Sequence, residues 1–288
     1  MATTSDSSDS ERKMGGIVID GSNDDFKRPQ VTDNQLSRLF YLNIAATIFQ
    51  AVTGVAILIL LDQDKTYSWF SNFPAVDEDA EGNPYGLGPE PKELFDFSTG
   101  YLAGVFLLLS ALDHLAVCSF FKGSYEQGIR SNYNVFRWLE YSVSASVMRV
   151  LVAILSGVSD IHMLFLIVGL TACTMLFGLV FELDNAGRPI NQVKWYSFWI
   201  GFVPHLFCWA VVICYFFRNV SKGDPPGFVW AIIVIIFFLD LTFAVTLFLQ
   251  WRGKGRWKDY VFGEIAFIVL SFTSKQLLAW INFQGGNR

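Results

Sequence analysis

Long apolar stretches constrain this chain most, because each one matches the thickness of a membrane. A helix rises about 1.5 Å per residue, so roughly 20 apolar residues cross about 30 Å of hydrocarbon. A helix also satisfies its own backbone polar groups in lipid. We therefore expect an all-α membrane protein, a seven-transmembrane-helix bundle. The expected spans are Leu39–Leu61, Thr99–Phe121, Val135–Leu155, His162–Phe181, Trp195–Phe217, Phe228–Leu249 and Tyr260–Ile281.

The segments outside the spans differ in composition. Residues 1–37 are rich in Ser and Asp and lack an apolar core of signal-peptide length, so we expect a disordered cytoplasmic tail there and the bundle at 38–288. Residues 62–97 carry many acids with Gly and Pro. This segment is expected to be a long extracellular loop that forms a structure of its own, whose kind the periodicity does not identify.

Basic residues near the span ends set the expected orientation. They are concentrated on the side of the N-terminal tail, which predicts a cytoplasmic N-terminus and an extracellular C-terminus. The net charge of −5 argues against a nucleic-acid partner. The residues counted on the tail side are Lys27, Arg28, Arg38, Lys122, Arg130, Arg137, Arg188, Lys194, Arg252, Lys254, Arg256 and Lys258, and those on the other side are Lys65, Lys92, Arg149, Arg218, Lys222 and Arg288.

One lysine, Lys275, lies inside the last apolar span. A cation within a bilayer costs a few kcal/mol or more, so its presence needs a reason. Its Cα–Cβ bond leans toward the start of its helix, away from the nearer membrane surface, so the amine is expected to point into the bundle. Such a lysine serves either a structural ion pair or covalent chemistry with a carbonyl compound, and both require a nearby carboxylate.

Glu140 in the third span is the best partner for Lys275, because an intramembrane glutamate is itself a candidate functional residue. If the third helix begins near Ile129, Glu140 and Lys275 differ in depth by about 6 Å, which a lysine stem spans. The residues expected around the pair are Ser144 and Met148 on the Glu140 face, Tyr141 beside it, and Ser271 one turn before the lysine.

Four segments together resemble the heliorhodopsins, in order from the first span to Trp280. They are LSALDHLAVCS (Leu109–Ser119), NVFRWLEYSVSASVM (Asn134–Met148), GKGRWKDYVFGE (Gly253–Glu264) and SFTSKQLLAW (Ser271–Trp280). The resemblance implies a rhodopsin-like retinal protein of the plasma membrane, inverted relative to type-1 rhodopsins. This orientation agrees with the one expected from the basic residues.

The resemblance also implies roles for residues that match the family. Lys275 is expected to bind all-trans-retinal as a protonated Schiff base, with Glu140 as its counterion. It further implies a light sensor that is a homodimer and does not pump ions. The other matching positions are Ser110 and His114 near the Schiff base, Asn134 and Ser271 in the same hydrogen-bonded surroundings, and Trp138 and Tyr141 beside the counterion.

The sequence departs from the family at several positions. Gln50 stands where we expect a first-helix histidine, and Asp113 and Asp240 are additional intramembrane acids. These acids are either structural or part of a proton path, so a light-gated proton channel remains an alternative to the sensor. Arg149 is expected to pair with Asp160 or to reach outward.

A third alternative is a receptor or transporter in which the lysine and glutamate form only a salt bridge. No enzymatic or metal-binding motif is recognised in the sequence, so we predict neither activity. The basic loop WRGKGRWKDY suits anionic lipid headgroups of the bilayer, and equally a cytoplasmic signalling partner.

Overall fold

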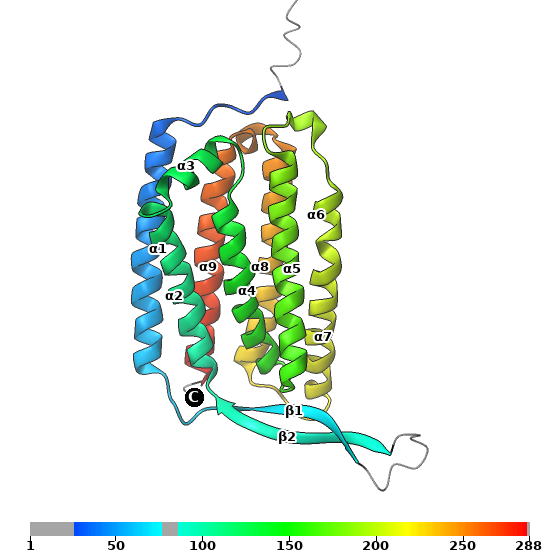
Figure 1. The fold of residues 1–288 in the computed structure, drawn as a ribbon. Coiled ribbons are helices and arrows are strands. Elements are labelled where there is room, and N and C mark those ends of the chain that lie inside the picture. Colours follow the sequence, from blue (N-terminus) through cyan, green and yellow to red (C-terminus); the bar gives the residue numbers. More distant parts are fainter. Residues whose placement is uncertain (1–25, 77–85, 287–288) are drawn as a thin grey trace, which may run out of the picture.

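The computed structural model describes residues 26–76 and 86–286. Within these residues, seven segments are long and apolar enough to cross a membrane, and one of them consists of two consecutive helices. This confirms the predicted seven-helix bundle (Figure 1). Its helices and strands are α1 (Asp33–Leu60), β1 (Tyr67–Val76), β2 (Leu87–Phe97), α2 (Thr99–Cys118), α3 (Lys122–Arg130), α4 (Val135–Leu155), α5 (Ile161–Asn185), η2 (Ile190–Gln192), α6 (Tyr196–Ile200), α7 (Phe202–Val220), α8 (Gly227–Arg252), η3 (Gly255–Lys258) and α9 (Tyr260–Gly286).

Polar caps fix where several helices begin. Thr32 and Gln35 form a capping box at the start of α1, in which each side chain accepts a hydrogen bond from the backbone of the other. Asn134 caps α4 and Asp160 caps α5 through their side chains. The predicted end of the tail at residue 37 is therefore too late, because residues 33–37 are already helical. Residues 1–25 of that tail lie outside the described part.

The fifth span is confirmed, at Tyr196–Val220, although the structure divides it into α6 and α7 at Gly201, three residues before Pro204, which lacks a backbone donor. One further expectation about the helices is wrong. The third span does not begin near Ile129, because that residue belongs to the separate short helix α3 and α4 begins at Val135. Helix α3 lies at the end of the bundle where α1 begins (Figure 1).

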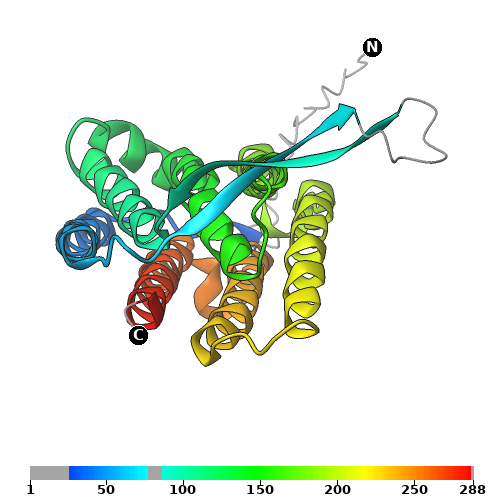
Figure 2. The same cartoon turned by 90° about the horizontal axis from the view of Figure 1, so that it is seen from below.

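The loop between the first two spans contains an antiparallel hairpin, β1 and β2, at the opposite end of the bundle. It crosses beneath the helices and projects beyond them (Figure 2). The Phe70 amide donates to the Ser159 carbonyl over 2.9 Å, and the Asn72 amide donates to the Asp160 carboxylate over 2.6 Å. The hairpin is thus fastened to the turn between α4 and α5.

Apolar side chains lie both inside and outside the bundle. Two buried clusters fill the interior, one around Leu151 and Phe216 and the other around Phe181 and Trp251. Large apolar side chains such as Phe165 and Leu206 are exposed on the outer surface of the helices. An apolar exterior of this kind is suited to lipid rather than water.

Candidate retinal site

Lys275 and Glu140 meet inside the bundle as an ion pair. Their Nζ and Oε1 atoms are 2.9 Å apart, and the two side chains are 2% and 5% exposed. Nζ also donates to the Ser271 hydroxyl over 2.7 Å, and it lies 5.2 Å from the centre of the Tyr141 ring. The predicted lysine–carboxylate pair is therefore present, with Ser271 and Tyr141 beside it.

The depths of the two residues differ from those predicted, because α4 starts deeper in the bundle than α9. The side chain of Asn134, which caps α4, donates to Glu264 in the first turns of α9 over 2.9 Å. Counted from that contact, Glu140 is six residues along α4 and Lys275 eleven along α9. The difference of five residues, or about 8 Å, is covered by a lysine stem leaning back along its helix.

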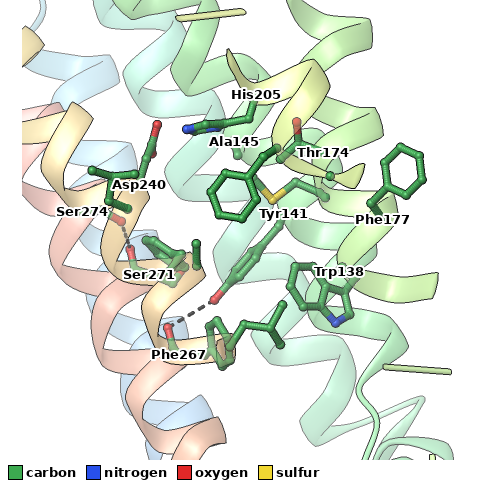
Figure 3. Close-up of a pocket in the computed structure, with 18 of the residues that line it drawn as sticks. Trp138, Tyr141, Ala145, Thr174, Phe177, His205, Asp240, Phe267, Ser271 and Ser274 are labelled. Carbon is green, nitrogen blue, oxygen red and sulfur yellow. Dashed lines mark hydrogen bonds between the residues drawn. The ribbon is translucent and has the colours of Figure 1, made fainter. Parts of the chain in front are cut away.

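A large cavity extends from Lys275 between α4, α5, the α6–α7 pair, α8 and α9 (Figure 3). It encloses about 950 Å³ of space, including the part open to the surroundings. Predicted site residues that line it are Trp138, Tyr141, Ser144, Met148, Asp240, Ser271 and Lys275.

Close packing of Trp138 shapes one wall of this cavity. A Cβ atom on Gly178 of α5 would lie 2.2 Å from the Trp138 ring, so only glycine allows the indole to pack there. Tyr141 is held by its hydroxyl, which donates to the Phe267 carbonyl over 3.2 Å (Figure 3). The aromatic walls are thus fixed by contacts to α5 and α9.

A second, smaller cavity lies on the other side of the ion pair. It is lined by Glu140, Asp113, His114 and Asn134 and holds about 340 Å³ of space, including the part open to the surroundings. Lys275 lines the large cavity and Glu140 the small one, so the ion pair stands between them, and Tyr141 lines both. This arrangement gathers one of the additional acids, Asp113, near the counterion but leaves the other, Asp240, in the large cavity.

The first-helix residue that approaches His114 is Asn43, not Gln50. The Asn43 Oδ1 and His114 Nδ1 atoms are 2.6 Å apart. Gln50 is buried about two turns farther along α1. Within the described chain, neither its amide nor the buried Ser110 hydroxyl has a hydrogen-bond partner. Gln50 therefore does not contact His114, although both side chains are buried.

Asp240 is bound in an ion pair with Arg149, and it also accepts a hydrogen bond from the Trp209 indole over 3.0 Å. The expectation that Arg149 pairs with Asp160 is therefore wrong. Asp160 instead caps α5 and binds Asn72. The structural interpretation of Asp240 is thus favoured over a role in a proton path.

A buried charge cluster near the start of α4 is not among the predicted site residues. Arg137 forms ion pairs with both Glu182 and Glu264, and all three side chains are at most 5% exposed. Tyr260 donates to Glu182 over 3.3 Å. Arg137 and Arg149 should not have been counted as surface charges for orientation, since both are buried. Glu182 and Glu264, which lie in or directly beside apolar stretches of the sequence, could have indicated such a cluster.

The residues fit a retinal-type chromophore. A buried amine with its own carboxylate stands at the wall of an apolar, aromatic cavity, as a lysine-bound polyene requires. Among the described residues no group of three or more His, Cys, Asp and Glu side chains is placed to hold a metal ion. Seven spans with such a site define a rhodopsin-type membrane protein.

Comparison with known proteins agrees with that class. Residues 39–286 match the heliorhodopsin family, and the chain therefore belongs to this family. Heliorhodopsins bind retinal and are light-sensing membrane proteins rather than a classical family of enzymes. Among curated proteins, none matches the chain.

Proposed function

We propose that this heliorhodopsin is a light sensor that holds all-trans-retinal on Lys275 and converts light into a slow conformational signal without pumping ions. The observation that carries the proposal is the buried Lys275–Glu140 pair at the wall of the large cavity. Retinal supplies an aldehyde for the lysine amine and a polyene that isomerises in light.

The protein's own residues have simple tasks in this proposal. Glu140 stabilises a proton at Nζ, because a buried cation needs a carboxylate beside it. Ser271 accepts a hydrogen bond from the same atom. Trp138 and Phe267 border the cavity and keep water from the pair. A change in the position of Nζ relative to Glu140 alters the contact between α4 and α9, which is a basis for a two-state bundle.

The light-gated proton channel is the second candidate function. The additional acids Asp113 and Asp240 favour it, because ionisable side chains inside a membrane often mark ion paths. The Arg149–Asp240 pair supports sensing instead, since Asp240 is already held by a guanidinium and by Trp209.

The proposal includes a cytoplasmic N-terminus in the plasma membrane, a homodimer and a cytoplasmic signalling partner. The orientation rests on the basic residues at the span ends, whose excess on the N-terminal side remains after Arg137 and Arg149 are removed from the count. The partner is proposed at the basic loop WRGKGRWKDY, which includes η3. Protease protection of tags at either terminus, in intact cells, tests the orientation.

The test of the chromophore site is the visible spectrum of the purified protein with all-trans-retinal. We expect an absorption band that disappears in Lys275→Ala and that loses its proton at lower pH in Glu140→Gln. Glu126→Gln is the matched control, because Glu126 pairs with Lys122 at the surface of α3. A band that survives in Lys275→Ala would contradict the proposal, and so would a colourless wild type beside a control rhodopsin that regenerates.

Photocurrent recordings separate the sensor from the channel. The sensor predicts no light-induced proton current in the wild type. A current that disappears in Asp113→Asn and Asp240→Asn would establish the channel instead. Extraction and chromatography of the bound chromophore test the all-trans isomer.

A further inference from the structure

Asp240 is the one carboxylate among the described residues that line the large cavity. Its Oδ2 atom takes both the ion pair with Arg149 and the hydrogen bond from the Trp209 indole, and neither contact uses Oδ1. Arg149 does not line the cavity, and its side chain is 5% exposed against 23% for Asp240. The ion pair therefore turns its negative end toward the cavity and its positive end away from it.

This carboxylate lies well away from the Lys275–Glu140 pair. Its partner Arg149 is nine residues beyond Glu140 on α4, which is about 14 Å along the helix axis. Its other donor, Trp209, belongs to α7, and α8 lies between α7 and α9 in both views of the bundle (Figures 1 and 2). One cavity thus has a cation, Lys275, at its α9 wall and an anion, Asp240, toward α7.

Stability alone does not account for a charge at this wall. A buried ion pair is weak evidence for stability, because apolar residues of similar size often serve as well. The Nε and Nη1 atoms of Arg149 are also buried without a hydrogen-bond partner in the described part of the chain, which adds to the cost of the pair. The orientation of the pair toward the cavity therefore needs a further reason.

A fixed charge beside a chromophore changes the energy of the light that it absorbs. This step rests on the proposed function, in which the chromophore nitrogen on Lys275 is a cation. Light absorption by such a conjugated cation moves positive charge from the nitrogen toward the far end of the conjugated chain. A carboxylate near the nitrogen therefore stabilises the ground state more and raises the transition energy, whereas one near the far end stabilises the excited state more and lowers it.

We propose that Asp240 is a wavelength-determining residue, which shifts the absorption of the lysine-bound chromophore to longer wavelength and so opposes the effect of Glu140. Arg149 and Trp209 hold the carboxylate ionised and in place. Arg149 lies behind it, so the opposing effect of the guanidinium on the chromophore is weaker. His205 on α7 is a titratable neighbour on the same part of the wall, and its ring lies beside the carboxylate (Figure 3).

The visible absorption maximum of the purified protein with all-trans-retinal tests the proposal. We expect Asp240→Asn to absorb at shorter wavelength, with a shift on the order of ten nanometres. Glu140→Gln, recorded at a pH at which its chromophore nitrogen keeps the proton, should shift in the opposite direction. Asp184→Asn is the matched control and should not shift, because Asp184 is similarly exposed and pairs with Arg188 but lies outside the cavity. Shifts of the same sign in Asp240→Asn and Glu140→Gln would refute the proposal.

A compensated variant covers the case in which Asp240→Asn does not fold, since that change leaves Arg149 without its carboxylate. Arg149→Met with Asp240→Leu removes both charges. We expect a smaller shift to shorter wavelength, because the carboxylate is the charge nearer the cavity. A maximum at or above the wild-type wavelength in this double variant would overturn the proposal. A merely structural pair would change the unfolding midpoint without shifting the band.

Infrared spectroscopy of the retinal-free protein tests the charge on Asp240 without the chromophore. We expect the difference between the wild type and the double variant to show the loss of carboxylate bands. Loss of a protonated carboxyl band instead would mean that Asp240 is neutral, which contradicts the proposal. A colourless wild type would overturn this proposal and the proposed function together, whereas a coloured wild type with the same maximum as Asp240→Asn would overturn this one alone.

Discussion

Arg149 on α4 and Asp240 on α8 form an ion pair in the interior of the bundle, at the large cavity. The guanidinium also lies 4.3 Å from the centre of the Trp209 ring, and the same indole donates to Asp240. The pair therefore joins α4, α7 and α8 through one cluster. Its position explains why two charges so far from a membrane surface are tolerated.

The first prediction concerns that pair. Asp240→Asn leaves Arg149 buried without a carboxylate, and breaking a buried pair in this way costs about 3–5 kcal/mol. We expect a clear fall in the thermal unfolding midpoint in detergent. The double variant Arg149→Met with Asp240→Leu should recover much of the loss, because it leaves no unpaired charge. Equal stability of Asp240→Asn and the wild type would show that the pair contributes nothing.

The second prediction concerns Arg137, which holds Glu182 and Glu264 apart at the start of α4. Arg137→Met leaves two buried carboxylates facing each other, and we expect a loss of about 3 kcal/mol or more. Arg137→Lys should rescue only part of this, because an ammonium does not present the guanidinium's planar fork to two carboxylates. Arg38→Met, on the exposed side of α1, is the control. Unfolding curves for the wild type and the three variants measure these differences in stability.

The third prediction concerns the contact between Gly178 and Trp138. Gly178→Ala must displace the indole, since the added Cβ would overlap the ring. We expect a shifted visible band and slower regeneration with retinal, because Trp138 lines the large cavity. Gly169→Ala on the same helix is a matched control, as a Cβ there meets nothing within 4 Å. If the two variants behave alike, Trp138 does not shape the chromophore site.

The fourth prediction concerns pH and the hairpin. Partial burial acts to raise the pKa of the Asp160 carboxyl, but hydrogen bonds donated by the Met163 amide, the Asn72 side chain and the His162 amide together lower it below the ordinary value of 3.8. A carboxyl with a lowered pKa stabilises the folded state above the ordinary value, and this contribution disappears as pH falls through the folded value.

Hydrogen exchange at the Phe70 amide measures this effect, because that amide donates to Ser159 beside the carboxyl. We expect the protection of Phe70 to decrease as the pH is lowered through the acidic range. Asp160→Asn should remove that pH dependence, whereas Asp224→Asn, in the loop between α7 and α8, should retain it. Persistence of the dependence in Asp160→Asn would assign it to another group.

The sequence predicts the coarse structure of this protein well. Apolar length alone locates the seven spans, and the helical spacing of Ser271 and Lys275 puts both on one face, where the structure finds them bonded. The lysine's need for a carboxylate then selects Glu140. These inferences succeed because they depend on local periodicity and on the cost of burying a charge.

Other features depend on how helices pack, which local patterns do not contain. Arg137 looks like a surface cation at a span end, yet α4 starts deep enough for two distant helices to bring glutamates to it. Likewise, α1 carries both Asn43 and Gln50 among its buried residues, and only the position of α2 decides which one meets His114. Rotation and depth of each helix are properties of the assembled bundle.

The attachment of the hairpin to Asp160 sets an order on biogenesis. Asn72 and Asp160 are separated by 88 positions in the chain, and three membrane spans of the bundle begin between or just after them. Because a chain emerges from the ribosome from its N-terminus, the hairpin is synthesised before the turn that anchors it exists. The first loop must therefore wait, unanchored, until the fourth span has begun to emerge.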